Sequence, residues 1–189
     1  MEVIPLHRVQ SQAMREIFEE ERQCWAEKLL WDYAEPLNVV SSMLEFKSLS
    51  GYAAVDDGLP VGYCYFLEVD RTGLVGNCFV RNSQAGKGVE EKLLGKVIWE
   101  LQNVRSVCRI ESQFISFHPW GVREFFKSFH FVGYDRTFRQ APCKAALPKP
   151  VPSIGFRPWT LGIFEEAAKI TTEAYQSLVD SKISIHYQS

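Results

Sequence analysis

The sequence has no long apolar segment, because no stretch approaches the roughly 18 uninterrupted apolar residues that a membrane-spanning helix needs. It also lacks an excess of either charge: 21 Lys and Arg stand against 23 Asp and Glu, a formal net charge of -2. A dedicated nucleic-acid binder or a polybasic membrane binder would show a strong excess of Lys and Arg. The first residues have no charged-then-apolar layout of a secretory signal. We therefore expect a soluble cytoplasmic protein that binds neither nucleic acid nor a membrane.

Cysteine is scarce and scattered. The five cysteines are odd in number, and no two of them are spaced as CxxC. A secreted disulfide framework would be even and dense, and a zinc site would show paired ligands, so we predict neither a framework nor a metal site. Cys64, Cys78 and Cys108 lie in apolar runs, and we predict that all three are small buried hydrophobic residues.

Apolar side chains are present in the amount that a folded domain requires. The chain of 189 residues is 46% hydrophobic and 13% aromatic, which supports a real core and excludes wholesale disorder. Four of the nine prolines fall within eleven residues, at Pro142, Pro148, Pro150 and Pro152. Proline fixes φ and removes a hydrogen-bond donor, so this stretch is a stiff, extended connector. We predict a body over residues 1–140, a proline-rich linker over 141–153 and a tail over 154–189.

The first half of the body predicts a short strand, two helices and three strands. Ser11 is expected to cap the first helix, and the second helix is expected around residues 24–33, ending before Pro36. The turn sequence at 56–58 then separates two strands. The next strand, over residues 74–80, contains Gly76, which predicts a bulge or a close backbone approach.

The second half of the body changes to a helical period. One helical face is formed by Val89, Leu93, Leu94, Val97, Ile98 and Leu101. A strand over 107–117, a helix starting at Pro119 and a strand over 132–138 follow. This order predicts an α/β fold with a mixed sheet, in which the early strands are joined by hairpins and the late strands by crossovers.

The sharpest local motif is the glycine-rich segment 84–88, between a strand that ends at Val80 and a helix that begins at Val89. Such a turn exposes backbone N–H groups at the positive end of a helix dipole, where a phosphate or pyrophosphate can bind. The motif is not a Walker loop, which would need Ser or Thr where Gly88 stands, nor a dinucleotide fingerprint, which would need glycine where Glu91 stands. A simpler interpretation stays open, in which the acids of the first helical turn only offset the dipole. A third interpretation is a binding module for another phosphate ligand.

The element order and this loop resemble the GCN5-related N-acetyltransferase (GNAT) family over about residues 2–139. The family motif R/Q-x-x-G-x-G/A places Ala85 at its first position, Gly88 at the central glycine and Glu90 at the last position. The resemblance implies a mixed, mostly antiparallel central sheet flanked by helices. It also implies that the loop holds the pyrophosphate of acetyl-CoA or another acyl-CoA, while a strand edge pairs with the pantetheine arm. The implied binding residues are Phe79, Val80, Ala85, Gly86, Lys87, Gly88 and Val89.

The resemblance implies transfer of an acetyl or other acyl group to a small-molecule or peptide amine by direct attack, without a metal. Two departures from the family pattern concern the chemistry: Phe126 stands where many members have a tyrosine, and the fourth strand carries no acid. The candidate catalytic groups that remain are Glu68, Glu111 and His118, each of which also has an ordinary role as a strand or turn residue. The alternative is a degenerate, catalytically silent domain that serves as a structural, dimerisation or regulatory half.

The tail carries a second resemblance. Residues 154–159 look like the opening strand of another GNAT unit, and the next helix has apolar residues on one face. The arrangement resembles the start of the second half in bacterial tandem-GNAT proteins, so we expect the chain to be the first part of such a protein. The helix at about 160–180 is expected to pack on the body or, in a homodimer, on a second chain.

Overall fold

The computed structural model describes residues 1–117, 121–135, 155, 157–176 and 178. The chain divides into two compact units, Met1–Phe129 and His130–Ser189. The expected proline-rich linker lies outside the described residues, so the predicted domain boundaries stay predictions.

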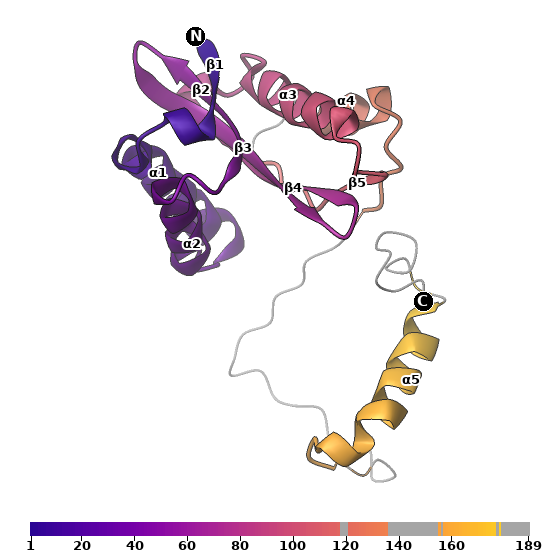
Figure 1. The fold of residues 1–189 in the computed structure, drawn as a ribbon. Coiled ribbons are helices and arrows are strands. Elements are labelled where there is room, and N and C mark those ends of the chain that lie inside the picture. The colour runs from indigo at the N-terminus through magenta and orange to yellow at the C-terminus, as the bar shows by residue number, and fades with distance from the viewer. Residues whose placement is uncertain (118–120, 136–154, 156, 177, 179–189) are drawn as a thin grey trace. The chain divides into compact units, whose positions relative to one another are not determined.

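The first unit is built on a five-stranded sheet whose spatial order follows the chain order (Figure 1). Its strands are β1 (Glu2–Pro5), β2 (Ser50–Asp56), β3 (Leu59–Val69), β4 (Thr72–Val80) and β5 (Arg109–Ser112). Neighbouring strands are antiparallel from β1 to β4, and β4 and β5 are parallel. Short turns connect β2 to β3 and β3 to β4, two helices lie between β1 and β2, and one helix joins the parallel pair β4 and β5. The predicted mixed, mostly antiparallel sheet is confirmed.

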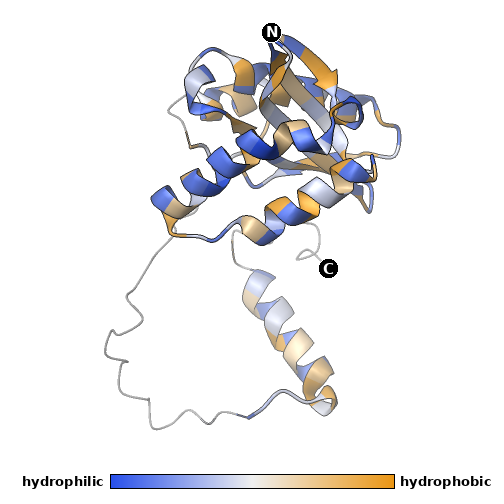
Figure 2. Ribbon diagram, turned by 90° about the vertical axis from the view of Figure 1, so that its left-hand side faces the viewer, coloured by the Kyte–Doolittle hydropathy of each residue, from blue (hydrophilic) through white to orange (hydrophobic). Residues whose placement is uncertain are grey.

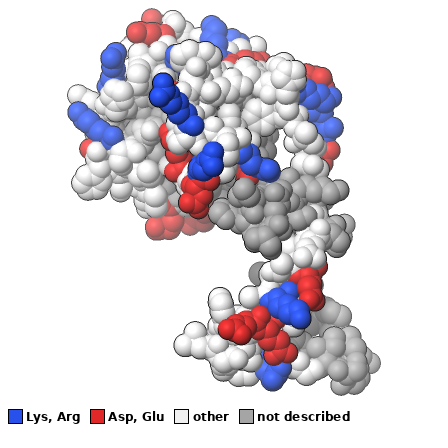
Figure 3. All heavy atoms as spheres, turned by 45° about the vertical axis from the view of Figure 1, so that its right-hand side comes forward, with Lys and Arg blue, Asp and Glu red and all other residues white. Residues whose placement is uncertain are grey.

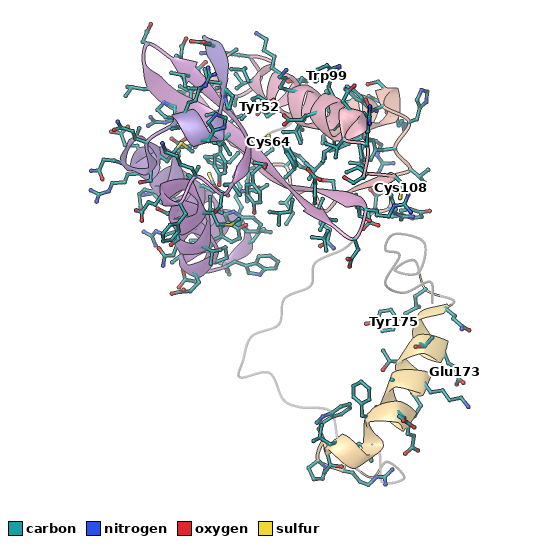
Figure 4. The ribbon with its side chains drawn as sticks, in the orientation of Figure 1. Tyr52, Cys64, Trp99, Cys108, Glu173 and Tyr175 are labelled. Carbon is teal, nitrogen blue, oxygen red and sulfur yellow. The ribbon has the colours of Figure 1, made fainter. Side chains whose placement is uncertain are left out.

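Helices cover both faces of this sheet (Figure 1). Helices α1 (Arg15–Leu29) and α2 (Ala34–Glu45) cover one face, whereas α3 (Val89–Asn103) and α4 (Val122–Ser128) cover the other. Hydrophilic and hydrophobic residues interchange along each helix, as expected for helices that bury one side (Figure 2). The apolar face predicted for α3 is confirmed, because all six of its predicted residues are fully buried. A hydrogen bond from Tyr52 of β2 to Glu100 also ties α3 to the sheet, and Figure 4 labels Tyr52 on the sheet near α3.

Two predictions about the first helices are wrong. Ser11 does not cap a helix with its side chain: it begins a short 3-10 turn, and α1 starts at Arg15. The second predicted helix belongs partly to α1, which ends where Leu30 adopts a left-handed conformation. Pro36 does not follow a helix but lies at the third position of α2, where its missing N–H would have no intrahelical acceptor in any case.

The end of the body also differs from the prediction. The strand expected over residues 107–117 is shorter, covering Arg109–Ser112, and residues 132–135 of the last predicted strand are not in a strand. Cys108 is exposed rather than buried, because it precedes β5, and its thiol lies 3.5 Å from the carbonyl oxygen of Arg71. Cys64 and Cys78 are buried as predicted.

In the second unit the described residues form one α-helix, α5 (Phe164–Gln176). Its start coincides with the predicted helix, and Phe164 makes an edge contact with the ring of Trp159, with 6.4 Å between the ring centroids. The assignment of this unit to the start of a second GNAT domain stays a prediction. None of the helices in the described parts of the chain is long and apolar enough to cross a membrane.

Candidate functional site

A bulge interrupts the pairing of β3 with β4. Cys64 pairs with Cys78 and Phe66 pairs with Val75, so two residues of β4 stand opposite Tyr65 alone. These two residues are Gly76 and Asn77. A Cβ atom at position 76 would lie 2.1 Å from the ring of Tyr65, so only glycine fits there. The bulge predicted at Gly76 is confirmed, and such a bulge bends its strand and re-aims the neighbouring side chains.

A cleft opens between β4 and β5 just beyond the bulge. The parallel pairing covers Thr72–Val75 against Arg109–Ser112 and goes no further in the described residues. The cavity in this cleft is small, about 10 Å³, close to the space that one water molecule occupies. Its described lining comes from β4, from α3 and from the segment after β5, and consists of Cys78, Phe79, Val80, Glu90, Phe114, Ser116 and Phe117. The second half of β4 therefore lies along this cleft.

The loop that follows β4 is fastened to α1. The guanidinium of Arg81 contacts Glu20 at 2.9 Å and Glu16 at 3.1 Å, and the backbone N–H of Asn82 donates to Glu20 over 2.6 Å. Elsewhere on the visible face of the body, basic and acidic side chains are interspersed and form no large patch of one sign (Figure 3). The contacts of Arg81 and Asn82 with Glu16 and Glu20 thus fix the start of the loop against α1.

The glycines of this loop have the backbone that only glycine adopts easily. Gly86 has φ 73° and Gly88 has φ 74°, and a Cβ atom at Gly86 would meet nothing within 4 Å. Gly88 is the residue before the first turn of α3. The side chain of Val89 is fully buried in the core, so this residue offers only its backbone to a ligand. Lys87 is exposed, and Ala85 ends a short 3-10 turn. Before the first turn of α3 the loop thus has open space at Gly86, whereas the Oε2 atom of Glu91 would lie 3.8 Å from a Cβ atom at Gly88.

Glu90 points into the cleft and not into solvent. Only 4% of it is exposed, and it lies among the cleft residues beside Cys78. The hydrogen bond between the thiols of Cys64 and Cys78, burial, and the charge of Glu90 together raise the pKa of Cys78 well above its usual value. Cys64 lies within the sheet (Figure 4). A thiol held protonated in this way is a poor nucleophile, which excludes the simplest covalent mechanism at this cleft.

A buried glutamate that the sequence prediction missed lies behind the bulge. Glu21 of α1 is fully buried. Its Oε1 atom accepts hydrogen bonds from the indole N–H of Trp25, over 3.1 Å, and from the side-chain amide of Asn77; its Oε2 accepts one from the hydroxyl of Tyr63, over 2.5 Å. Burial raises the pKa of Glu21 to about 7, although these three hydrogen bonds act in the opposite direction. The carboxyl group thus ties α1 to β3 and to the bulge of β4.

The sequence did contain a signal for this residue. Met14, Ile17, Phe18, Glu21 and Trp25 lie at offsets 0, 3, 4, 7 and 11, which is one face of a helix. When an acid lies within an apolar stripe, either the stripe has been assigned to the wrong face or the acid is buried and hydrogen-bonded. Because Glu21 follows directly on Glu19 and Glu20, it looks like part of a solvated acidic run.

Aromatic rings link the end of α1 to the segment after β5. The ring of Trp25 stacks on that of Tyr33, with 4.1 Å between centroids, and meets the ring of Phe117 edge-on at 5.0 Å. Lys28 donates a hydrogen bond of 2.5 Å to the carbonyl oxygen of Phe117, and the ring of Phe117 also contacts Phe79. The α1 side of the cleft is therefore walled by aromatic residues.

Two of the three catalytic candidates from the sequence, Glu68 and Glu111, are not among the described residues that line this cleft. Glu68 is exposed and pairs with Gly73, on the far side of the bulge. Glu111 of β5 is engaged by the guanidinium of Arg109 at 2.6 Å. His118 lies outside the described residues, and the ring of Phe126 in α4 packs on the cleft residue Phe114 at 5.7 Å. The described residues contain no group of three or more His, Cys, Asp or Glu that could hold a metal ion.

Comparison with known proteins identifies the fold. No family model and no curated protein sequence matches the chain. Among solved structures, a protein of Agrobacterium tumefaciens with the provisional name acetyltransferase is similar over 75% of this chain and 100% of its own, with 15% identity and a TM-score of 0.51. Another provisionally named acetyltransferase covers 78% of this chain and 100% of its own, with 13% identity and a TM-score of 0.52. A fourfold mutant of a Bacillus halodurans protein reaches a TM-score of 0.50 at 10% identity, over 75% of this chain and 100% of its own. The mixed sheet with helices on both faces is therefore the fold of these three structures, two of which carry the name acetyltransferase.

Proposed function

We propose that the body is a GNAT-type N-acyltransferase, which transfers an acetyl or other acyl group from acyl-CoA to the amine of a small molecule or peptide. The observation that carries the proposal is the opening between β4 and β5 at the bulge, next to a glycine loop at the start of α3. The thioester of acyl-CoA needs a strand edge to lie against, and its pyrophosphate needs a helix N-terminus, so an acyl-CoA site needs these two features side by side. The free thiols of Cys24, Cys64 and Cys78 fit a reducing cytoplasm.

In this proposal the backbone does most of the binding. The N–H groups at Gly88 and Val89, at the positive end of α3, would hold the pyrophosphate, with the exposed Lys87 beside it. The pantetheine arm would pair with β4 at Phe79 and Val80, which line the cleft. Gly86 leaves space for the close approach of the phosphate groups.

The proposed reaction is direct attack of the neutral amine on the thioester carbonyl carbon. A C–N bond forms, negative charge develops on the carbonyl oxygen, and the N–H groups of the open β4 edge stabilise it. The C–S bond then breaks, the nitrogen loses one proton, and the thiolate of CoA takes one up from water, since Phe126 offers no hydroxyl. The products are an amide and free CoA.

A catalytically silent domain is the second candidate, and the position of Glu90 favours it. A carboxylate that lines the cleft opposes the negative charges of CoA. Together with Phe126 in place of a phenol, this residue is compatible with a structural or regulatory role beside an active partner. The two candidates differ in whether acyl-CoA binds and whether any amine is acylated.

The first test is thermal unfolding of the whole chain with increasing acetyl-CoA, with adenosine diphosphate as the control ligand. A ligand present at 100 times its dissociation constant stabilises the folded state by about 2.7 kcal/mol, which raises the midpoint of a domain of this size by about 5–10 °C. We expect that shift with acetyl-CoA. Its absence at every concentration would leave the silent domain as the function.

A matched pair of variants assigns the binding to the loop. Gly88→Glu adds a side chain and a negative charge at the start of α3, so it should abolish the shift caused by acetyl-CoA. Gly58→Glu is the control, because Gly58 also has a positive φ of 80° and open space around it, but lies in the turn between β2 and β3. Equal loss of binding in both variants, or in neither, would separate the loop from the site.

A further inference from the structure

We propose, on the basis of the proposed function, that Glu21 is a positioning residue for acyl transfer: its carboxylate holds Asn77 and thereby fixes the β4 bulge at the entrance of the cleft. The role differs from those of Glu68, Glu111 and His118, because Glu21 does not touch the reacting atoms. It acts on the strand that would receive the thioester.

The hydrogen-bond pattern supports this role. Glu21 accepts from three donors that belong to three separate elements: Trp25 of α1, Tyr63 of β3 and Asn77 of β4. Asn77 is one of the two bulge residues and directly precedes Cys78, which lines the cleft. A change at Glu21 is therefore transmitted by one hydrogen bond to the strand edge at the cleft.

A purely structural role explains the residue poorly. A buried carboxylate costs desolvation energy, and a well-packed apolar residue at the same place usually serves stability equally well or better. Other residues of α1 that are buried on this face are apolar and include Ile17 and Phe18. Glu21 stands where α1 contacts the bulge, which is the expected position for a group that fixes a functional geometry.

The charge state of Glu21 decides how firmly Asn77 is held. The carboxylate accepts from all three donors, whereas the protonated acid must itself donate through one oxygen and loses acceptor capacity. The groups that face it are Trp25 on its own helix, Tyr33 after α1, Tyr63 and Tyr65 on β3, and Asn77 and Cys78 on β4. None of these groups is cationic. Burial raises the pKa of Glu21 to about 7, so protonation occurs within the working range of an enzyme.

The experiment compares Glu21→Gln with Glu27→Gln, a control on the exposed side of the same helix. For the wild type we expect kcat to fall below about pH 7, up to tenfold per pH unit. Glu21→Gln should lower kcat at pH 8 at least tenfold, flatten this acidic limb and change the dissociation constant of acetyl-CoA less than twofold. Glu27→Gln should match the wild type. An active wild type whose kcat and pH profile are unchanged by Glu21→Gln overturns the proposal.

Two further measurements cover the other outcomes. If Glu21→Gln does not fold, Asn77→Ala is measured instead. This variant removes the side-chain amide that Glu21 holds and leaves the hydrogen bonds of Glu21 to Trp25 and Tyr63. Unchanged kcat in Asn77→Ala also overturns the proposal. Tryptophan fluorescence measured against pH should show a transition near pH 7 that is missing in Trp25→Phe. If the wild type shows this fluorescence transition but does not bind acetyl-CoA, both the proposed function and the role of Glu21 in acyl transfer are rejected. If the wild type binds acetyl-CoA and turns over without the transition, only the role of Glu21 is rejected.

Discussion

The two faces of the central sheet each bury one glutamate and treat it differently. Under α1 and α2, Glu21 is surrounded by donors from three elements and lies behind the β4 bulge. Under α3, Glu90 lies in the first helical turn and points into the cleft. The first acid has three hydrogen-bond donors and contacts the bulge, whereas the second lines the cleft that a ligand would enter. Burial alone therefore does not tell how each acid acts, and its partners and its place relative to the cleft do.

The rest of the two faces is apolar, which makes the comparison measurable. The buried cluster under α3 and α4 includes Val80, Leu93 and Leu94, and the cluster under α1 and α2 includes Leu37 and Phe79. Apolar contacts do not titrate. The pH dependence of stability should therefore be sought in the two buried glutamates, of which Glu21 has a pKa raised by burial.

The largest expected effect is loss of a core side chain under α3. Leu94 is fully buried, so Leu94→Ala should lower the free energy of unfolding by about 2–5 kcal/mol, through lost transfer energy and the cavity left behind. The loss should be equal at pH 5 and pH 8, measured by urea denaturation. A loss that changes with pH would show that the apolar face is coupled to a titrating group.

The next effect is the pH dependence that Glu21 imposes. Its pKa is raised from 4.5 to about 7 in the folded protein. A raised carboxyl pKa gives stability that is fully present below the unfolded value and is lost as pH rises through the folded value, because the folded state then gives up a proton that it holds more tightly. Between pH 4.5 and pH 7.5 the wild type should therefore lose about 3 kcal/mol relative to Glu21→Gln.

Urea denaturation of both proteins across this pH range measures that difference. Because the two chains share every other titrating group, subtracting their curves isolates position 21. Parallel curves would mean that Glu21 has the same pKa in both states.

The sequence predicts one face of this molecule better than the other. The apolar stripe of α3 is regular and unbroken, and the bulge is marked by a glycine that no other residue could replace beside Tyr65. On the α1 side the prediction failed at both helix boundaries, since Pro36 lies in the first turn of α2, where its missing N–H needs no acceptor, and a left-handed residue ends α1 at Leu30. A proline is compatible with the position after a helix and with the first turn of one, and leucine carries no signal for a left-handed end, so the local pattern did not decide either boundary.

The candidate site divides in the same way. The cleft residues Phe79 and Val80 and the glycine loop are close together in the sequence, and the structure places all of them at the C-terminal end of β4. Glu21 could be found only by noticing an acid on an apolar stripe, because its partners Tyr63 and Asn77 are 42 and 56 residues away. A carboxyl group whose hydrogen-bond partners are so far away along the chain leaves no local sequence motif.

The smallest expected effect distinguishes Glu90 from Glu21 most directly. If Glu90 opposes the charge of a bound phosphate, Glu90→Gln should keep the shape of the side chain and tighten acetyl-CoA binding by about 1 kcal/mol, or roughly fivefold. Calorimetric titration at low salt measures this gain, and it should shrink at high salt as charges are screened. Glu35→Gln is the control, because it neutralises an exposed acid in the first turn of α2, and Glu35 is not a cleft residue. Weaker acetyl-CoA binding in Glu90→Gln would contradict the prediction. It would mean that the Glu90 carboxylate accepts a hydrogen bond from a donor of the ligand and does not oppose its phosphates.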